Sequence, residues 1–144
     1  MATIRNEVLI EAPAEAVWDA MRDFGAVHER VVPGFVTACK LEGDTRVLTF
    51  ANGLVARERL VDLDDEARRL VYAIPEGLAE HYNAQVEVVA DGAGRCRVIW
   101  VIDLLPNELA PQVRAMTHDG VIAMKRALDR LGQRGAEMEI ARRF

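Results

Sequence analysis

The chain of 144 residues is 51% hydrophobic and 28% charged, with a formal net charge of −5. This length and composition are typical of one globular domain and exclude a disordered chain. The negative charge would repel a phosphate backbone, so we expect neither nucleic acid nor an anionic membrane as a partner. Two cysteines are too few for a disulfide framework or a structural zinc site. No apolar run reaches the ~18 residues of a membrane span, and the charged N-terminus differs from a secretory signal peptide, so we expect a cytoplasmic protein.

The first part of the chain predicts a strand followed by two short helices. Residues 3–10 alternate weakly between apolar and polar side chains, and the proline that follows, Pro13, suits the first turn of a helix. Apolar residues at helical spacing then predict a helix over 14–22. We expect a second short helix over 26–32.

The middle of the chain has the pattern of successive hairpins. Gly, Asn, Asp and Pro residues separate short runs rich in Val, Leu, Ile, Tyr and Thr. This pattern predicts a meander of six strands, over residues 35–41, 46–51, 54–62, 68–74, 80–90 and 95–105.

The last long element is predicted to be an amphipathic helix that begins at Asn107, whose side chain can cap free backbone N–H groups, and ends near Leu131. The buried face of the meander is the large apolar surface left for it, so we expect the helix to lie across the concave side of the sheet. Residues 1–131 are predicted to form a single domain, and residues 132–144 a tail with a marginal helical pattern.

Several local motifs resemble those of one superfamily. Residues 10–18 resemble its opening I-x-A-P-x-x-x-V-W, and residues 23–25 resemble its D-F-G. Residues 58–72 resemble its E-R-L and L-D-D-x-x-R-R-L-x-Y block, while Tyr82 and residues 98–100 stand where it has N-Y and V-x-W.

Together with the order of elements, these motifs resemble the SRPBCC superfamily, also called START-like, in its polyketide cyclase/dehydrase and lipid transport branch. The resemblance covers about residues 4–131. It implies an α+β domain with the birch-pollen-allergen-like helix-grip fold. In this fold a seven-stranded antiparallel sheet wraps around a long C-terminal helix, with two short helices between strands 1 and 2.

The resemblance also implies a cavity between the concave face of the sheet and the long helix. Strand alternation and helix phase predict which side chains face it, and a similar plant hormone-receptor branch lines its pocket at several of the same positions. The gate and latch of that branch are replaced here by residues 51–56 and 77–79, so its gated mechanism is not expected. The predicted ligand-binding residues are Phe50, Glu58, Tyr72, Ile74, Tyr82, Trp100, Met116, Gly120 and Met124.

Glu58 is the most informative of these residues, because a carboxylate facing an apolar cavity is costly unless it is paired, solvated or protonated. Desolvation should raise its pKa, and Glu58→Gln should then be at least as stable as the wild type near neutral pH. We favour ligand contact over general-base catalysis with His28 or a tyrosine, since an isolated acid seldom does chemistry. Tyr72 and Tyr82 either contact a ligand oxygen or pack as core aromatics. Gly120 either leaves volume for a ligand or lets the helix approach an aromatic ring.

Three hypotheses about function follow from the sequence. The leading one is binding or transport of a small, mainly hydrophobic molecule in the internal cavity. The alternative is a polyketide cyclase/dehydratase-like enzyme that uses the same cavity, and the third is an interaction protein with a residual cavity. No metal-binding or nucleotide-binding motif is present, so no metal or cofactor is predicted. The sequence leaves a homodimer open.

Overall fold

The computed structural model describes residues 1–143 and contains one antiparallel sheet of seven strands, in the order β1-β7-β6-β5-β4-β3-β2. Each strand boundary lies within two residues of its predicted position. The elements are, in chain order, β1 (Ala2–Ile10), α1 (Ala14–Met21), the 3-10 turn η1 (Phe24–Ala26), α2 (Val27–Arg30), β2 (Val36–Glu42), β3 (Thr45–Phe50), β4 (Val55–Asp64), β5 (Arg69–Ala73), β6 (His81–Ala90), β7 (Cys96–Leu105), the 3-10 turn η2 (Asn107–Leu109) and α3 (Ala110–Arg143).

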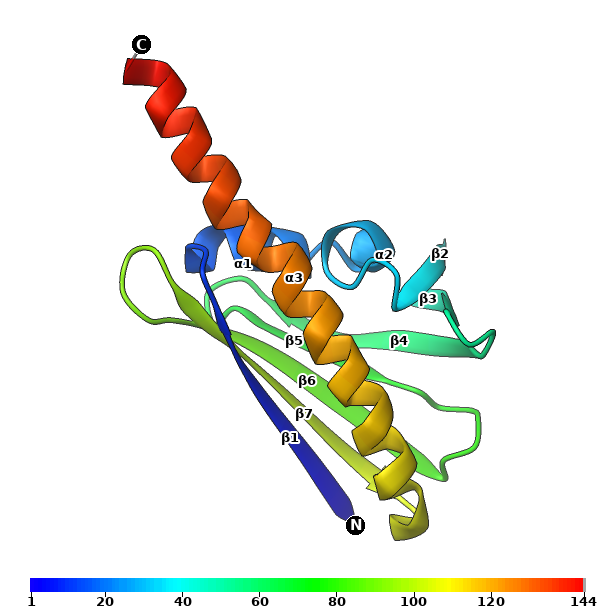
Figure 1. Cartoon of the computed structure of the whole chain (residues 1–144). Coiled ribbons are helices and arrows are strands. Elements are labelled where there is room, and N and C mark those ends of the chain that lie inside the picture. Colours follow the sequence, from blue (N-terminus) through cyan, green and yellow to red (C-terminus); the bar gives the residue numbers. More distant parts are fainter. Residues whose placement is uncertain (144) are drawn as a thin grey trace.

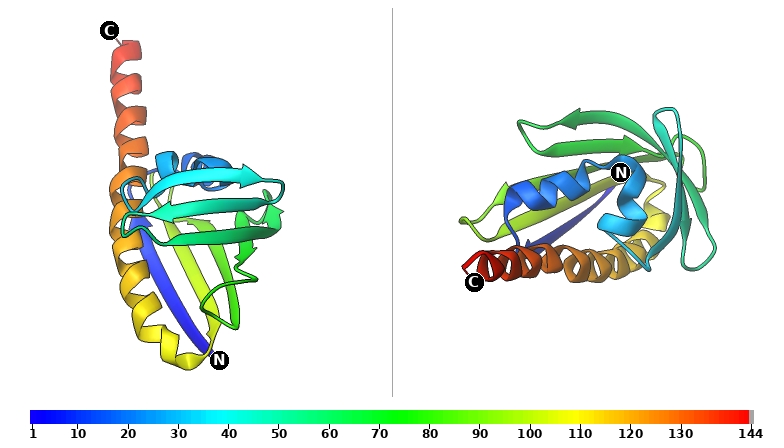
Figure 2. Two further views of the ribbon diagram at one scale, coloured as in Figure 1. Left: turned by 90° about the vertical axis from the view of Figure 1, so that its right-hand side faces the viewer. Right: turned by 90° about the horizontal axis from the view of Figure 1, so that it is seen from above.

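The sheet curves around α3, which crosses its concave side (Figure 1). The view from above shows the curvature of the sheet, while Figure 1 and the left view of Figure 2 show α1 and α2 near one end of the sheet. This arrangement is the helix-grip fold that the resemblance implies. Among the described residues, no helix combines the length and the apolar character needed to cross a membrane.

The core lies between the concave face and α3, and strand alternation predicts it well. On β6, Ala84, Val86 and Val88 are buried. On β7, Val98 and Ile102 are fully buried, whereas the residues between them on the other face are more exposed. The period of two in each strand therefore decides which side chains face inward.

The start of the long helix differs from its prediction. Asn107 lies in the 3-10 turn η2, whose N-cap is Pro106, and no side chain caps that turn by a hydrogen bond. The α-helix begins at Ala110, and Pro111 occupies its first turn, where a missing backbone N–H costs nothing.

The predicted end of this helix at Leu131 is also wrong, because α3 continues to Arg143. Its last turns extend beyond the rest of the molecule (Figures 1 and 2). The helix thus runs through the predicted tail, residues 132–144, of which Phe144 lies outside the described residues. The domain boundary after residue 131 stays a prediction.

Gly132 marks a close approach of α3 to the chain that follows β1, and not a helix stop. A Cβ atom at this position would overlap the backbone oxygen of Glu11. One turn earlier, Asp129 Oδ1 accepts a hydrogen bond from the backbone N–H of Glu11 at 2.8 Å, and Lys125 Nζ donates to the carbonyl of Leu9 at 2.7 Å. These contacts hold α3 against the end of β1.

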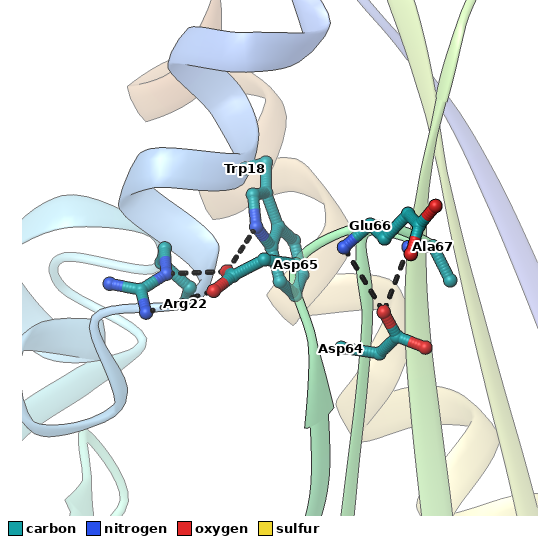
Figure 3. A network of polar contacts seen from close by, with 6 residues as sticks. All are labelled: Trp18, Arg22, Asp64, Asp65, Glu66 and Ala67. Carbon is teal, nitrogen blue, oxygen red and sulfur yellow. Dashed lines mark hydrogen bonds and ion pairs between the residues drawn. The ribbon is translucent and has the colours of Figure 1, made fainter.

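A second set of polar contacts joins α1 to the turn between β4 and β5 (Figure 3). Asp65 Oδ1 accepts hydrogen bonds from Trp18 Nε1 at 2.9 Å and from Arg22 Nε at 2.7 Å. Asp64 Oδ1 closes the turn by accepting from the backbone N–H groups of residues 66 and 67, each at 3.0 Å. This acidic turn therefore positions α1 over the sheet.

Candidate functional site

A cavity of about 420 Å³ lies between α3 and the concave face of the sheet. This volume falls within the ~300–1,000 Å³ range of small-molecule sites. The wall is mostly apolar. Eight of the nine residues predicted for the site line it, namely Phe50, Glu58, Tyr72, Ile74, Tyr82, Trp100, Met116 and Met124.

Gly120 is the exception, because it is buried but does not belong to the cavity wall that residues 1–143 form. A Cβ atom here would lie 3.2 Å from Cε2 of Phe35 and 3.3 Å from Cζ3 of Trp100. Both rings line the cavity, and the glycine lies behind them. Of the two interpretations of Gly120, the structure supports close packing of the helix on aromatic rings, and its placement in the cavity wall is corrected.

Glu58 is not isolated, contrary to the expectation from the sequence. It lies directly opposite Arg46 in the register of β3 and β4, and each residue is only 5% exposed. The Nε and Nη2 atoms of Arg46 both lie 2.8 Å from Oε1 of Glu58. The two side chains therefore form a buried ion pair in the cavity wall.

The guanidinium group of Arg46 contacts further groups besides Glu58. Its Nη1 atom donates a hydrogen bond to the backbone carbonyl of Phe24 at 3.3 Å. Its central carbon lies 4.0 Å from the ring centroid of Phe24 and 5.1 Å from that of Tyr72. Because all three nitrogens have partners and rings lie against the group, Arg46 has a fixed position.

Arg46 is the main residue that sequence reasoning missed, although a signal for it exists. It has the same parity as Phe50 on β3, so the alternation that turns Phe50 inward also turns Arg46 inward. An arginine is rarely buried without a partner. Its partner, Glu58, is identified by the register in which β3 pairs with β4. The alternation of side chains within a single strand does not give this register. Thr117, which is buried and lines the cavity from α3, was also missed.

The burial of these side chains shifts their protonation equilibria. Burial raises the pKa of Glu58, while the charge and the hydrogen bonds of Arg46 act in the opposite direction. Burial, and then the nearby charge of Glu58, raises the pKa of Tyr72 and of Tyr82 as well. Both phenols are therefore neutral at physiological pH. The hydroxyl oxygen of Tyr72 accepts a hydrogen bond from Trp100 Nε1 at 3.1 Å.

His28, considered above as a proton donor beside Glu58, does not line the cavity formed by the described residues. Its side chain is 22% exposed, and Nε2 lies 3.5 Å from Oε1 of Glu29. Its Nδ1 atom is buried without a hydrogen-bond partner in residues 1–143. The structure thus brings Glu58 together with Arg46 and two tyrosines, and does not bring it together with His28.

Comparison with known proteins adds a family and several similar folds. A family described as polyketide cyclase / dehydrase and lipid transport matches residues 1–135. A protein from Thermobifida fusca has a structure with 34% sequence identity and a TM-score of 0.73, and the match covers 96% of each chain. No curated protein sequence matches the chain.

Two other similar structures have lower sequence identity. XoxI from Bacillus cereus is 22% identical with a TM-score of 0.79, and the match covers 89% of this chain and 96% of XoxI. A point mutant of norcoclaurine synthase from Thalictrum flavum, in complex with a transition-state analogue, is 20% identical with a TM-score of 0.72. That match covers 94% of this chain and 96% of the synthase. At these identities the likeness extends to the fold alone.

Proposed function

Because the chain belongs to the polyketide cyclase / dehydrase and lipid transport family, we propose that it binds one small, mainly hydrophobic molecule in the cavity beneath α3. The observation that carries this proposal is the cavity itself. A space of about 420 Å³ with a mostly apolar wall and few polar groups is the usual form of a small-molecule site. The predicted site residues that line it are proposed as ligand contacts.

The direct test is mass spectrometry of organic extracts from the purified protein, which should reveal one co-purified apolar compound. A matched pair of variants then connects binding to the cavity. Val113 lines the cavity from α3, whereas Ala115 is exposed on the same helix. Val113→Phe should abolish or strongly weaken binding by filling the space, and Ala115→Phe should leave it unchanged. Equal binding by both variants would argue against this cavity as the site.

An enzyme of the cyclase/dehydratase type is the second candidate. It is favoured by a buried carboxylate with a raised pKa beside two tyrosines, because such perturbed groups gather at catalytic sites. The pairing of Glu58 with Arg46 makes the carboxylate a weaker candidate for a free base. In an enzyme, Glu58→Gln would retain substrate binding and lose turnover, whereas in a binding protein the variant would change affinity alone.

A further inference from the structure

Only one oxygen of the Glu58 carboxylate, Oε1, accepts hydrogen bonds from the described residues. Both close contacts from Arg46 reach Oε1, at 2.8 Å each. The second oxygen, Oε2, receives no hydrogen bond from residues 1–143, and it is not among their fully buried atoms, although the residue as a whole is only 5% exposed and lines the cavity. This oxygen is therefore open to the cavity and can accept a hydrogen bond from whatever occupies it, water or a ligand.

The cavity wall has no matching free positive charge. Arg46 is the one basic side chain that lines it among the described residues, and its three nitrogens are already engaged by Glu58 and Phe24. The other charged side chain in the wall, Glu76, is acidic. A ligand carboxylate would therefore enter an apolar space next to Glu58 with no cation free to neutralise it.

Given the binding function proposed above, on which this step rests, we propose that the ligand is an uncharged apolar molecule that ends in a hydroxyl group. The hydroxyl donates to Oε2 of Glu58, and the Arg46–Glu58 ion pair makes the cavity discriminate against carboxylates. Tyr82 lines the same cavity, and its phenol stays protonated because burial raises its pKa. The phenol can therefore donate to the oxygen of the same ligand hydroxyl.

The proposal is tested with three probes of equal chain length: decanol, decyl methyl ether and decanoate. Their affinities are measured by displacement of the uncharged dye Nile red at several pH values from neutral to mildly alkaline, because burial raises the pKa of Glu58. Decanol should bind about tenfold more tightly than the ether, which lacks a donor, and more tightly still than decanoate. If the ether or decanoate binds as well as decanol, the ligand class is wrong while binding in the cavity stands. If neither the dye nor any probe binds, the proposed function itself fails.

A charge-removing variant separates the ion pair from simple hydrophobicity, which by itself favours decanol over decanoate. Glu58→Gln leaves the Arg46 charge without its counterion, so decanoate should gain about tenfold relative to decanol. Glu66→Gln, which removes the same charge from an exposed turn, should leave the ratio unchanged. An unchanged ratio in a folded Glu58→Gln protein would overturn the role of the ion pair. The wild-type comparison of the three probes does not depend on the folding of this variant.

Discussion

At the scale of single residues, the ion pair between Arg46 and Glu58 is the feature with the largest expected energetic effect. The charge of each side chain compensates the charge of the other, at a site where both are buried from water. Removing one partner leaves the other charge buried without compensation, whereas removing both leaves an apolar site. The pair therefore behaves differently in single and double substitutions.

We expect Arg46→Met to lower the free energy of unfolding by about 3–5 kcal/mol, because Glu58 is then left buried and unpaired. Urea denaturation monitored by circular dichroism measures the change. The double variant Arg46→Met/Glu58→Leu should recover most of the loss. A double variant that is as unstable as the sum of the two single variants would mean that the pair has no energetic coupling.

The same pair leaves the direction of an expectation drawn from the sequence unchanged. In the structure Glu58→Gln gives the guanidinium group of Arg46 a neutral partner, as protonation of Glu58 also does. Burial outweighs Arg46 and raises the pKa of Glu58, so the folded protein favours the neutral side chain. Glu58→Gln is therefore expected to be at least as stable as the wild type near neutral pH, which urea denaturation of the two proteins measures.

The raised pKa of Glu58 predicts a specific dependence of stability on pH. The folded protein holds this proton more tightly than the unfolded chain, in which the pKa is about 4.3. The contribution of Glu58 to stability should therefore fall as pH rises from this value through the raised pKa, and should stay constant above it. An NMR titration of the Glu58 carboxyl group gives the pKa directly. A value at or below that of a free glutamate would show that Arg46 outweighs burial.

At the scale of elements, the position of α3 depends on its contact with the end of β1. The helix passes so close to Glu11 that Gly132 has no room for a side chain. The adjacent hydrogen bonds from Lys125 to Leu9 and from Glu11 to Asp129 need the same close approach. A glycine inside a helix is usually a cost, but here it permits the contact.

Two glycines of α3 provide a matched pair for this argument. Gly132→Ala should lower the free energy of unfolding by about 1–3 kcal/mol, since its Cβ would overlap backbone that cannot easily move. Gly135 lies three residues further on, and a Cβ atom there would meet nothing within 4 Å. Gly135→Ala should be neutral or stabilise by up to about 1 kcal/mol through helix propensity. Thermal and urea unfolding measure the change in stability of the two variants. Equal changes in the free energy of unfolding would contradict the close contact between Gly132 and Glu11.

At the scale of the whole molecule, the last part of α3 is separate from the core. The side chains from Gln133 to Arg143 are exposed, including Met138 at 60% and Ile140 at 57%. Leu128, which belongs to the same helix, is in contrast fully buried. The buried side chains of α3 therefore end before Gln133, although the helix continues.

A chain truncated after Gln133 should keep its free energy of unfolding within about 0.5 kcal/mol of the full chain, because the described residues that it loses, 134–143, are exposed. A chain truncated after Lys125 serves as the control and should unfold, since it lacks Leu128. Differential scanning calorimetry of both compares the transitions. A large loss in the longer chain would show that the extension is part of the cooperative unit.

Much of the candidate site was predictable from strand and helix periodicity together with the family resemblance. The alternation along β4 and β6 turned Glu58 and Tyr82 inward, and helix phase placed Met116 and Met124 on the same cavity. Gly120 shared that helix phase and still lies outside the wall. Periodicity gives the direction of a side chain, but the volume beside it depends on the neighbouring aromatic rings.

The sequence by itself determined the order of elements, the inward faces and the family of this chain, because these depend on local periodicity and on short motifs. Only the tertiary structure decided that Glu58 is paired with Arg46 and that Gly132 allows α3 to continue past β1. The contact of Gly132 with Glu11 joins segments that are distant along the chain, whereas Arg46 and Glu58 lie 12 residues apart on the two strands of one hairpin. The register of that hairpin and the distance between a helix and a loop describe how two elements pair or pack, whereas the periodicity within one element gives only the direction of its side chains.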